Sequence, residues 1–386
     1  MQFELALLPQ IFFGSGQIQN IQMHIRPFGS RVLLVADQQA LKTAHLEENL
    51  TKNNFEYLPF FVKNEPTTDI VDQGVSAGLE FKAEIVVGIG GGSALDAGKA
   101  ITGLITNGGL ASDYMEVVGK GFPIKYPALP YIAIPTTAGT GTEVTKNAVI
   151  LSETDKYKAS IRSPFLVPKI AIIDPSLTIT VPANVTASTG LDALTQLIEA
   201  YTSNKSQPVT DALALLGIQK AIKSLEIAYE HGDNLAARED MALAALLSGI
   251  CLANAGLGAV HGFASPLGAT IPHGVACAAI LANVVDQNIQ TLKVKIPNSP
   301  TLIKYANLGD MVARKSFKNL EDAHQILIQY LRDLTKKLKI PLLSQYGLKQ
   351  KDIQEIIIKV KKSSSIRYNP VELNDWALTK ILTQTL

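Results

Sequence analysis

Short apolar runs alternate with longer amphipathic stretches through the first half of the chain. The runs predict buried strands and lie at residues 31–36, 55–62, 84–88, 131–135 and 170–174. Apolar residues recur at helical spacing over 69–82 and 94–106, between these runs, and this spacing predicts helices. Buried strands that alternate with helices are typical of a parallel sheet covered on both faces. We therefore predict an α/β fold for this half.

After Pro182 the strand pattern nearly vanishes and long helical patterns replace it. The predicted helices cover residues 190–202, 208–229, 235–253, 275–287, 320–339 and 349–362. The last two are amphipathic and rich in Lys, and we expect their lysines to form solvated faces. Residues 293–301 predict a surface loop. The change in pattern predicts an α/β domain at residues 1–182 and an all-helical domain at residues 183–386.

Composition narrows the class of protein. A length of 386 residues suits two domains, and a net charge of +1 gives no electrostatic reason for nucleic-acid or membrane binding. Cys251 and Cys277 lie in apolar runs without a disulfide framework, and the start of the chain lacks signal-peptide features. The uncharged run 242–260 is long enough to span a bilayer, but it contains Asn254 and leads into His261. We expect a buried helix and a loop there, and a cytoplasmic protein.

A glycine-rich turn follows the strand predicted at residues 84–88. Glycines 90–92 permit close backbone approach to a ligand, and Ser93 can cap the next helix, whose amides attract an anion. The spacing is neither a G-x-G-x-x-G fingerprint nor a Walker loop, so a tight turn without a ligand is the alternative. Asp37 ends an earlier strand, where a carboxylate either accepts adenosine ribose hydroxyls or caps a helix. Together the two features favour NAD over NADP.

A second loop, at residues 134–145, is rich in threonine and glycine. It offers hydroxyl groups and small residues around which the backbone can curve, at Thr136, Thr137, Gly139, Thr140, Gly141 and Thr142. The loop follows a predicted strand, and dinucleotides bind at the carboxyl ends of parallel strands. The loop therefore supports a dinucleotide site.

Polar residues share one face of the helix predicted at residues 190–202. Asp192, Gln196 and Glu199 fall on this face, and a buried carboxylate needs a partner. His261 and His273 lie in a segment of small apolar residues, where imidazoles would be dry. Asp192 with both histidines would make an oxygen–nitrogen–nitrogen set suited to Zn(II) or Fe(II). A cluster of Asp–His hydrogen bonds explains the same pattern equally well.

Sequence blocks spread over most of the chain resemble the iron-containing (group III) alcohol dehydrogenase family. They are FGSGQI from Phe13, GIGGGSALDAGKAI from Gly88, AIPTTAGTGTEVT from Ala133, IIDPSLT from Ile172, TASTGLDALTQLIEAYTS from Thr186, GLGAVHGFASPLGA from Gly256, PHGVACA from Pro272 and NPVEL from Asn369. The resemblance implies a dehydroquinate synthase-like fold, with a Rossmann-like NAD(P) domain, a helical domain and a divalent metal between them. It also implies a homodimer that transfers hydride between NAD(H) and a small alcohol or aldehyde.

The resemblance assigns roles to individual positions. Asp37 matches the ribose position and Gly91 with Gly92 the pyrophosphate turn. Further cofactor positions are Ser93, Asp96, Thr136, Thr137, Thr140, Asn147, Lys158 and Leu177. The metal positions, for Fe(II) or Zn(II), are Asp192, Gln196, His261 and His273, and the two histidines are also the expected catalytic residues.

Three features depart from the family pattern. The usual fourth ligand is a histidine four residues after the aspartate; here it is Gln196, whose neutral oxygen suits Zn(II) or Fe(II) less well. A family histidine tied to proton transfer is replaced by Ser265, which is no base at neutral pH. The spacing of His261 and His273 is two residues shorter than usual. We expect weakened metal binding and a subgroup with glutamine at this ligand position.

Three alternatives remain open. One is a metal-independent reductase resembling maleylacetate reductases, in which His261 and His273 act as acids or oxyanion donors. Another is a hydroxyacid–oxoacid transhydrogenase with permanently bound NAD. The third is a nucleotide-binding protein without catalysis, against which the Asp192, His261 and His273 set argues.

Overall fold

The computed structural model describes residues 2–6, 8–268 and 270–386. Contacts within the chain divide it into two units. The first contains residues 5–181 together with 232–242. The second contains residues 182–231 and 243–386, with the first few residues of the chain.

The first unit is built on a six-stranded sheet with the order β1–β8–β5–β4–β2–β3. All of its strand pairs are parallel, which confirms the predicted parallel sheet. The strands are β1 (Gln10–Phe13), β2 (Arg31–Ala36), β3 (Glu56–Phe61), β4 (Ile85–Gly90), β5 (Tyr131–Pro135) and β8 (Ile170–Ile173). Only β1 lacks a counterpart in the sequence prediction, because four half-exposed residues at a sheet edge give little pattern.

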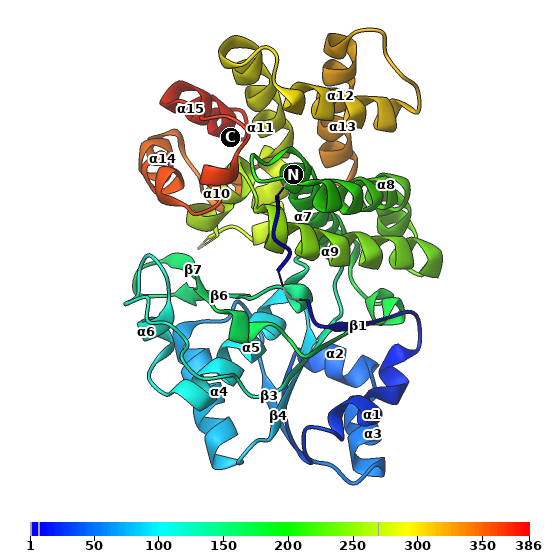
Figure 1. Ribbon diagram of the computed structural model, residues 1–386, viewed down its shortest axis with the longest axis vertical. Coiled ribbons are helices and arrows are strands. Elements are labelled where there is room, and N and C mark those ends of the chain that lie inside the picture. The colour runs from blue at the N-terminus through cyan, green and yellow to red at the C-terminus, as the bar shows by residue number, and fades with distance from the viewer. Residues whose placement is uncertain (1, 7, 269) are drawn as a thin grey trace. The chain divides into compact units, whose positions relative to one another are not determined.

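Helices cover both faces of this sheet (Figure 1). The apolar side chains of α1 (Ile21–Ile25), α2 (Gln38–Thr43) and α3 (Leu46–Lys52) pack on one face. Those of α4 (Thr68–Glu80), α5 (Gly92–Asn107) and α6 (Ala111–Tyr114) pack on the other. Strand side chains alternate between the faces, with Val32 and Leu34 in the first core and Leu33 and Val35 in the second.

A two-stranded hairpin was not predicted. Its strands, β6 (Asn147–Ser152) and β7 (Tyr157–Arg162), pair antiparallel. Ala148, Ile150 and Ile161 are buried against the core that contains α5. The alternating pattern of β6 and β7 is short and carries polar residues, so it differs from the continuous apolar runs of the parallel strands.

The second unit is helical. Its helices are α7 (Ala183–Thr202), α8 (Pro208–Glu230), α10 (Ala259–Leu267), α11 (His273–Lys295), α12 (Pro300–Ala313), α13 (Leu320–Lys337), α14 (Ile353–Lys362) and α15 (Asp375–Thr383). The end of α9 (Leu235–Ala255) belongs to it as well. Helix α11 packs against α7, α10, α12, α13 and α15, so it is the central helix of the unit.

The loop predicted at residues 293–301 is wrong at both ends. Helix α11 continues through Lys295, and α12 begins at Pro300. Ser299 caps α12, since its hydroxyl accepts from the Thr301 amide, and Pro300 suits the first helical position. These capping residues reduce the loop to a few positions.

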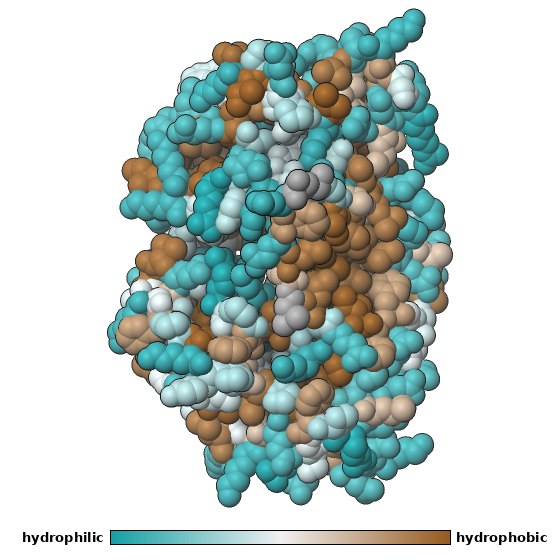
Figure 2. All heavy atoms as spheres, in the orientation of Figure 1, coloured by the Kyte–Doolittle hydropathy of each residue, from teal (hydrophilic) through white to brown (hydrophobic). Residues whose placement is uncertain are grey.

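The two Lys-rich helices bury one face each. Helix α14 buries Ile353, Ile357 and Val360, and the lysines near its end are largely exposed. Figure 2 shows hydrophilic residues over much of the area of α14, with apolar residues among them, and Ile358 of this helix is exposed. Among the described helices, none is on its own long and apolar enough to span a membrane; only α9 and α10 taken together would pass, and they are bent by 101°.

Candidate active site

The glycine turn joins β4 to α5 at the carboxyl edge of the sheet. Gly90 has φ +147°, and a Cβ there would lie 2.9 Å from the Ala94 Cβ, so both conformation and space require glycine. Gly91 is the N-cap of α5 and has no side chain with which to cap it. The expected cap by Ser93 is wrong, because the helix begins at Gly92 and Ser93 lies inside its first turn. The first amides of α5 therefore have no side-chain cap at the N-cap position, which suits an anion.

Asp37 lies beside this turn. Its amide donates to Ile89 O (3.0 Å), and the Gly90 Cβ position would lie 3.1 Å from the Asp37 Cβ. Its Oδ1 accepts from the Ala40 amide (2.9 Å) and so caps α2. Asp37 therefore caps a helix, which was one of its two predicted roles. It also lies beside the glycine turn, where its other predicted role, binding the ribose of a nucleotide, would require it.

The threonine loop meets the glycine turn. The Thr136 amide donates to Gly90 O (2.9 Å). Thr137 lies 3.5 Å from the position of a Gly91 Cβ, and Thr140 lies 2.8 Å from that of Gly92. The expected ribose, pyrophosphate and threonine positions therefore gather at one edge of the sheet.

The remaining expected cofactor residues have structural partners. Asp96 accepts from Thr142 Oγ1 (2.5 Å) and the Val149 amide (3.2 Å). Asn147 Oδ1 accepts from Arg162 Nε (3.0 Å), Lys158 pairs with Glu65 (2.8 Å), and Leu177 is in the core. These contacts fix the hairpin and the loop before it.

A buried lysine holds the same loop. Lys99 Nζ donates to Thr142 O (2.6 Å) and Asn147 O (2.5 Å). Burial lowers the pKa of Lys99 to about 8, against the attraction of Asp96 and Glu143. Burial likewise raises the pKa of Glu143 to about 7. The loop is therefore anchored from α5 by buried polar groups.

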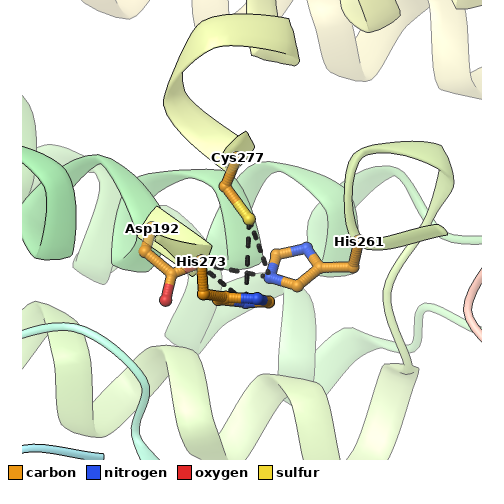
Figure 3. A group of neighbouring side chains, drawn as sticks. All are labelled: Asp192, His261, His273 and Cys277. Carbon is orange, nitrogen blue, oxygen red and sulfur yellow. Dashed lines mark hydrogen bonds and ion pairs between the residues drawn. The ribbon is translucent and has the colours of Figure 1, made fainter. Parts of the chain in front are cut away.

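Four side chains of the helical unit form a second cluster. Asp192, His261, His273 and Cys277 each place one donor atom within 4.8 Å of the others (Figure 3). Asp192 comes from α7, His261 from α10, and the other two from α11. The structure thus brings together the aspartate and both histidines that the sequence singled out.

Asp192 carries an oxygen that lacks a hydrogen bond. Among the residues that the structure describes, its buried Oδ1 has no hydrogen-bond partner, yet it lies 3.3 Å from His261 Nε2 and 3.7 Å from His273 Nε2. Burial acts to raise the Asp192 pKa, but His273 and His261 outweigh it and hold that pKa below its usual value. An ionised oxygen facing two imidazole nitrogens fits a divalent cation, which would satisfy all three atoms.

Glu199 orients His261. Its Oε2 accepts from His261 Nδ1 (2.6 Å), and its Oε1 accepts from the Val260 amide (2.6 Å). Because a carboxylate only accepts, Nδ1 carries a proton toward Glu199. A cation bound beside Asp192 would take the place of the proton on Nε2. This carboxylate–histidine arrangement is common around metal ligands. Glu199 belongs to the predicted polar face of α7, although the sequence gave it no role in the site.

Two expected positions have other partners. Gln196 is buried, and its Oε1 accepts from Ser248 Oγ (2.8 Å). The Ser265 hydroxyl donates to His261 O (3.4 Å), one helical turn earlier. Sequence reasoning missed Cys277, although it follows His273 by four residues, a spacing that places two side chains on one helix face.

Two family models match the chain. The model described as iron-containing alcohol dehydrogenase covers residues 9–175, and the one described as Fe-containing alcohol dehydrogenase family, C-terminal, covers residues 186–386.

Individual relatives match over nearly the whole length. Alcohol dehydrogenase 4 of Saccharomyces cerevisiae is 35% identical over 384 residues, which is 97% of this chain and 96% of that protein. The crystal structure of a 1,3-propanediol oxidoreductase superposes with a TM-score of 0.91 at 32% identity, covering 100% of both chains. Sulfoacetaldehyde reductase from Bifidobacterium kashiwanohense in complex with NAD+ superposes with a TM-score of 0.85 at 26% identity, covering 100% of this chain and 99% of the other.

Proposed function

The chain belongs to the iron-containing alcohol dehydrogenase family, and we propose that it uses NAD(H) and a divalent metal held by Asp192, His261 and His273. It is an oxidoreductase that transfers hydride between a nicotinamide cofactor and a small alcohol or aldehyde. The observation that carries the metal assignment is the buried Asp192 Oδ1, without a hydrogen bond and facing two imidazole nitrogens. A cation between these three atoms would bind the oxygen more directly than the two imidazoles do at 3.3 and 3.7 Å.

The sheet unit binds the cofactor in this proposal. The amides at the start of α5 and the backbone of Gly91 receive the pyrophosphate, while Asp37 accepts the ribose hydroxyls through the oxygen not used to cap α2. The negative charge of Asp37 disfavours a 2′-phosphate, so NAD is preferred to NADP. The NAD+ complex of the related sulfoacetaldehyde reductase supports this preference.

The helical unit holds the reacting oxygen and its proton. A divalent ion held by these residues would take the substrate oxygen as a further ligand, polarise a carbonyl group and lower the pKa of an alcohol. Glu199 keeps the His261 proton on Nδ1, away from the substrate. His273 has a side chain that is 34% exposed, against 2% for Asp192 and 6% for His261. We infer that the alcohol proton leaves on the His273 side, through that imidazole, the cofactor ribose or water.

Replacement of Asp192 by Asn tests this proposal. The amide keeps the size of the side chain and removes the charge that holds the cation. We expect turnover of NADH with small aldehydes to fall by at least about 100-fold, with NADH binding unchanged by fluorescence titration. Full turnover by this variant would refute the metal site, and turnover of no alcohol or aldehyde by the native protein would refute the substrate class.

Further expectations rest on the family resemblance. We propose that residues 1–182 act as the NAD-binding domain and residues 183–386 as the metal and substrate domain. We also propose that the protein is cytoplasmic and that it is a homodimer. Sedimentation analysis of the purified protein tests the dimer. The glutamine at position 196 marks a subgroup in this proposal.

A further inference from the structure

Cys277 lies where a fourth metal ligand would lie. Helix α11 begins at His273, and Cys277 follows one turn later on the same face. Its Sγ is 3.7 Å from His273 Nε2 and 3.8 Å from His261 Nε2. Figure 3 shows the thiol of Cys277 pointing toward the two imidazoles. Two of the four donors thus come from one helical turn.

The distances match a tetrahedral site. Zn–S bonds of about 2.3 Å and Zn–N or Zn–O bonds of about 2.1 Å give tetrahedral edges of about 3.6 Å for S to N and about 3.4 Å for N to O. The corresponding separations are 3.7 and 3.8 Å for Cys277 Sγ, and 3.3 and 3.7 Å for Asp192 Oδ1. Four of the six separations among these donor atoms therefore suit one ion, and all six lie within 4.8 Å.

Gln196 is a poorer candidate than Cys277 for the fourth metal ligand. Its Oε1 already accepts the Ser248 hydroxyl at 2.8 Å. An amide oxygen is also neutral, whereas a thiolate carries a full charge and is a preferred ligand of Zn(II). Among the His, Cys, Asp and Glu side chains of the described residues, the donor that lies beside Asp192 and the two histidines is the Cys277 sulfur.

We propose that Cys277 is the fourth protein ligand of the metal, as a thiolate, in place of Gln196. The inference rests on the proposed function, because it concerns the same ion. On binding, the S–H bond of Cys277 breaks, a sulfur–metal bond forms, and the proton leaves to solvent. The resulting oxygen, two-nitrogen and sulfur set is softer than a set of oxygen and nitrogen alone, so the site prefers Zn(II) to Fe(II).

Cobalt substitution tests the ligand directly. Thiolate coordination gives Co(II) a charge-transfer band in the near ultraviolet, which oxygen and nitrogen ligands do not give. We expect this band in the native protein loaded with Co(II), and its loss in Cys277→Ser. The chain has only two cysteines, so Cys251→Ser is a matched control and keeps the band. Gln196→Ala keeps it too.

Each outcome separates this inference from the proposed function. Stoichiometric Co(II) that shows ligand-field bands but no charge-transfer band overturns the Cys277 ligand and leaves the metal site standing. A band that persists in Cys277→Ser also overturns it. Failure of the native protein to bind Co(II) or Zn(II) overturns both the ligand and the metal-assisted function.

Affinity and X-ray absorption complete the test. Competition with a chromophoric chelator should show Zn(II) binding at least about 100-fold weaker in Cys277→Ser, with Cys251→Ser unchanged. If Cys277→Ser does not fold, the native zinc protein still answers the question. Its X-ray absorption should show one sulfur at about 2.3 Å, and a shell of only nitrogen and oxygen at about 2.0–2.2 Å would overturn the proposal.

Discussion

Replacing Glu199 with Gln should weaken metal binding without changing the size of the side chain. Glu199 accepts two buried hydrogen bonds, from His261 Nδ1 and from the Val260 amide, both at 2.6 Å. A glutamine oxygen can keep only one of them. If it keeps the Val260 amide, its NH2 group faces His261 Nδ1, and the ring proton must move to Nε2. That proton would occupy the lone pair which faces Asp192.

The expected magnitude follows from the lost hydrogen bond. A hydrogen bond to a charged group contributes about 1.5–3 kcal/mol, and loss of a carboxylate behind a ligating histidine lowers metal affinity by about 10–100-fold. The two estimates agree, since 1.4 kcal/mol corresponds to about a factor of ten in affinity. We therefore expect Zn(II) binding about 10–100-fold weaker in Glu199→Gln.

The assay is chelator competition at constant pH, with elemental analysis to fix stoichiometry. Glu355→Gln is a suitable control, because Glu355 lies on α14 and pairs with Lys359. Zn(II) affinity in Glu199→Gln within about twofold of the native value would refute the reasoning that Glu199 fixes the His261 tautomer.

Three further predictions concern the sheet unit. Asp37→Ser keeps a helix cap but loses the charge, so fluorescence titration should show NADH binding about 10–100-fold weaker and NADPH binding tighter; unchanged selectivity would contradict the ribose role. Gly91→Ala adds a methyl group at an ordinary contact distance, 3.5 Å, from Thr137, so the variant should fold normally. We expect it to bind NADH on the order of tenfold more weakly than the native protein. Equal NADH affinity would contradict the role of Gly91. Burial raises the Glu143 pKa from 4.5 to about 7, so the folded state binds the extra proton and native stability should fall by about 3 kcal/mol as pH rises from 4.5 to 7. Denaturation followed by circular dichroism should show no such loss of stability in Glu143→Gln. If the stabilities of the variant and the native protein change with pH in parallel, the Glu143 carboxyl is not the cause of the loss.

The sequence predicted the strands of the parallel sheet well because they are buried on both faces. The run at β2 is apolar at every position after Arg31 and ends sharply at Asp37. The hairpin of β6 and β7 was missed, since one face meets the core and the other does not. Helix ends followed capping chemistry, as at Ser299, which extended α12 into the predicted loop.

The candidate site was predicted in part for a similar reason. Asp192 and the two histidines stood out because charged or titratable groups are rare in apolar segments. Cys277 did not stand out, because a cysteine in an apolar run resembles a small core residue. Its proximity to His261 depends on the packing of α10 against α11, which no local pattern encodes.

The most direct test of the metal-assisted mechanism is the metal content of protein purified without chelator, measured together with NADH oxidation by a small aldehyde before and after chelation. We expect near-stoichiometric metal, loss of turnover when the metal is stripped, and recovery of turnover when Zn(II) or Fe(II) is returned. Metal-free protein that oxidises NADH at the same rate, and does not respond to added metal, would contradict it.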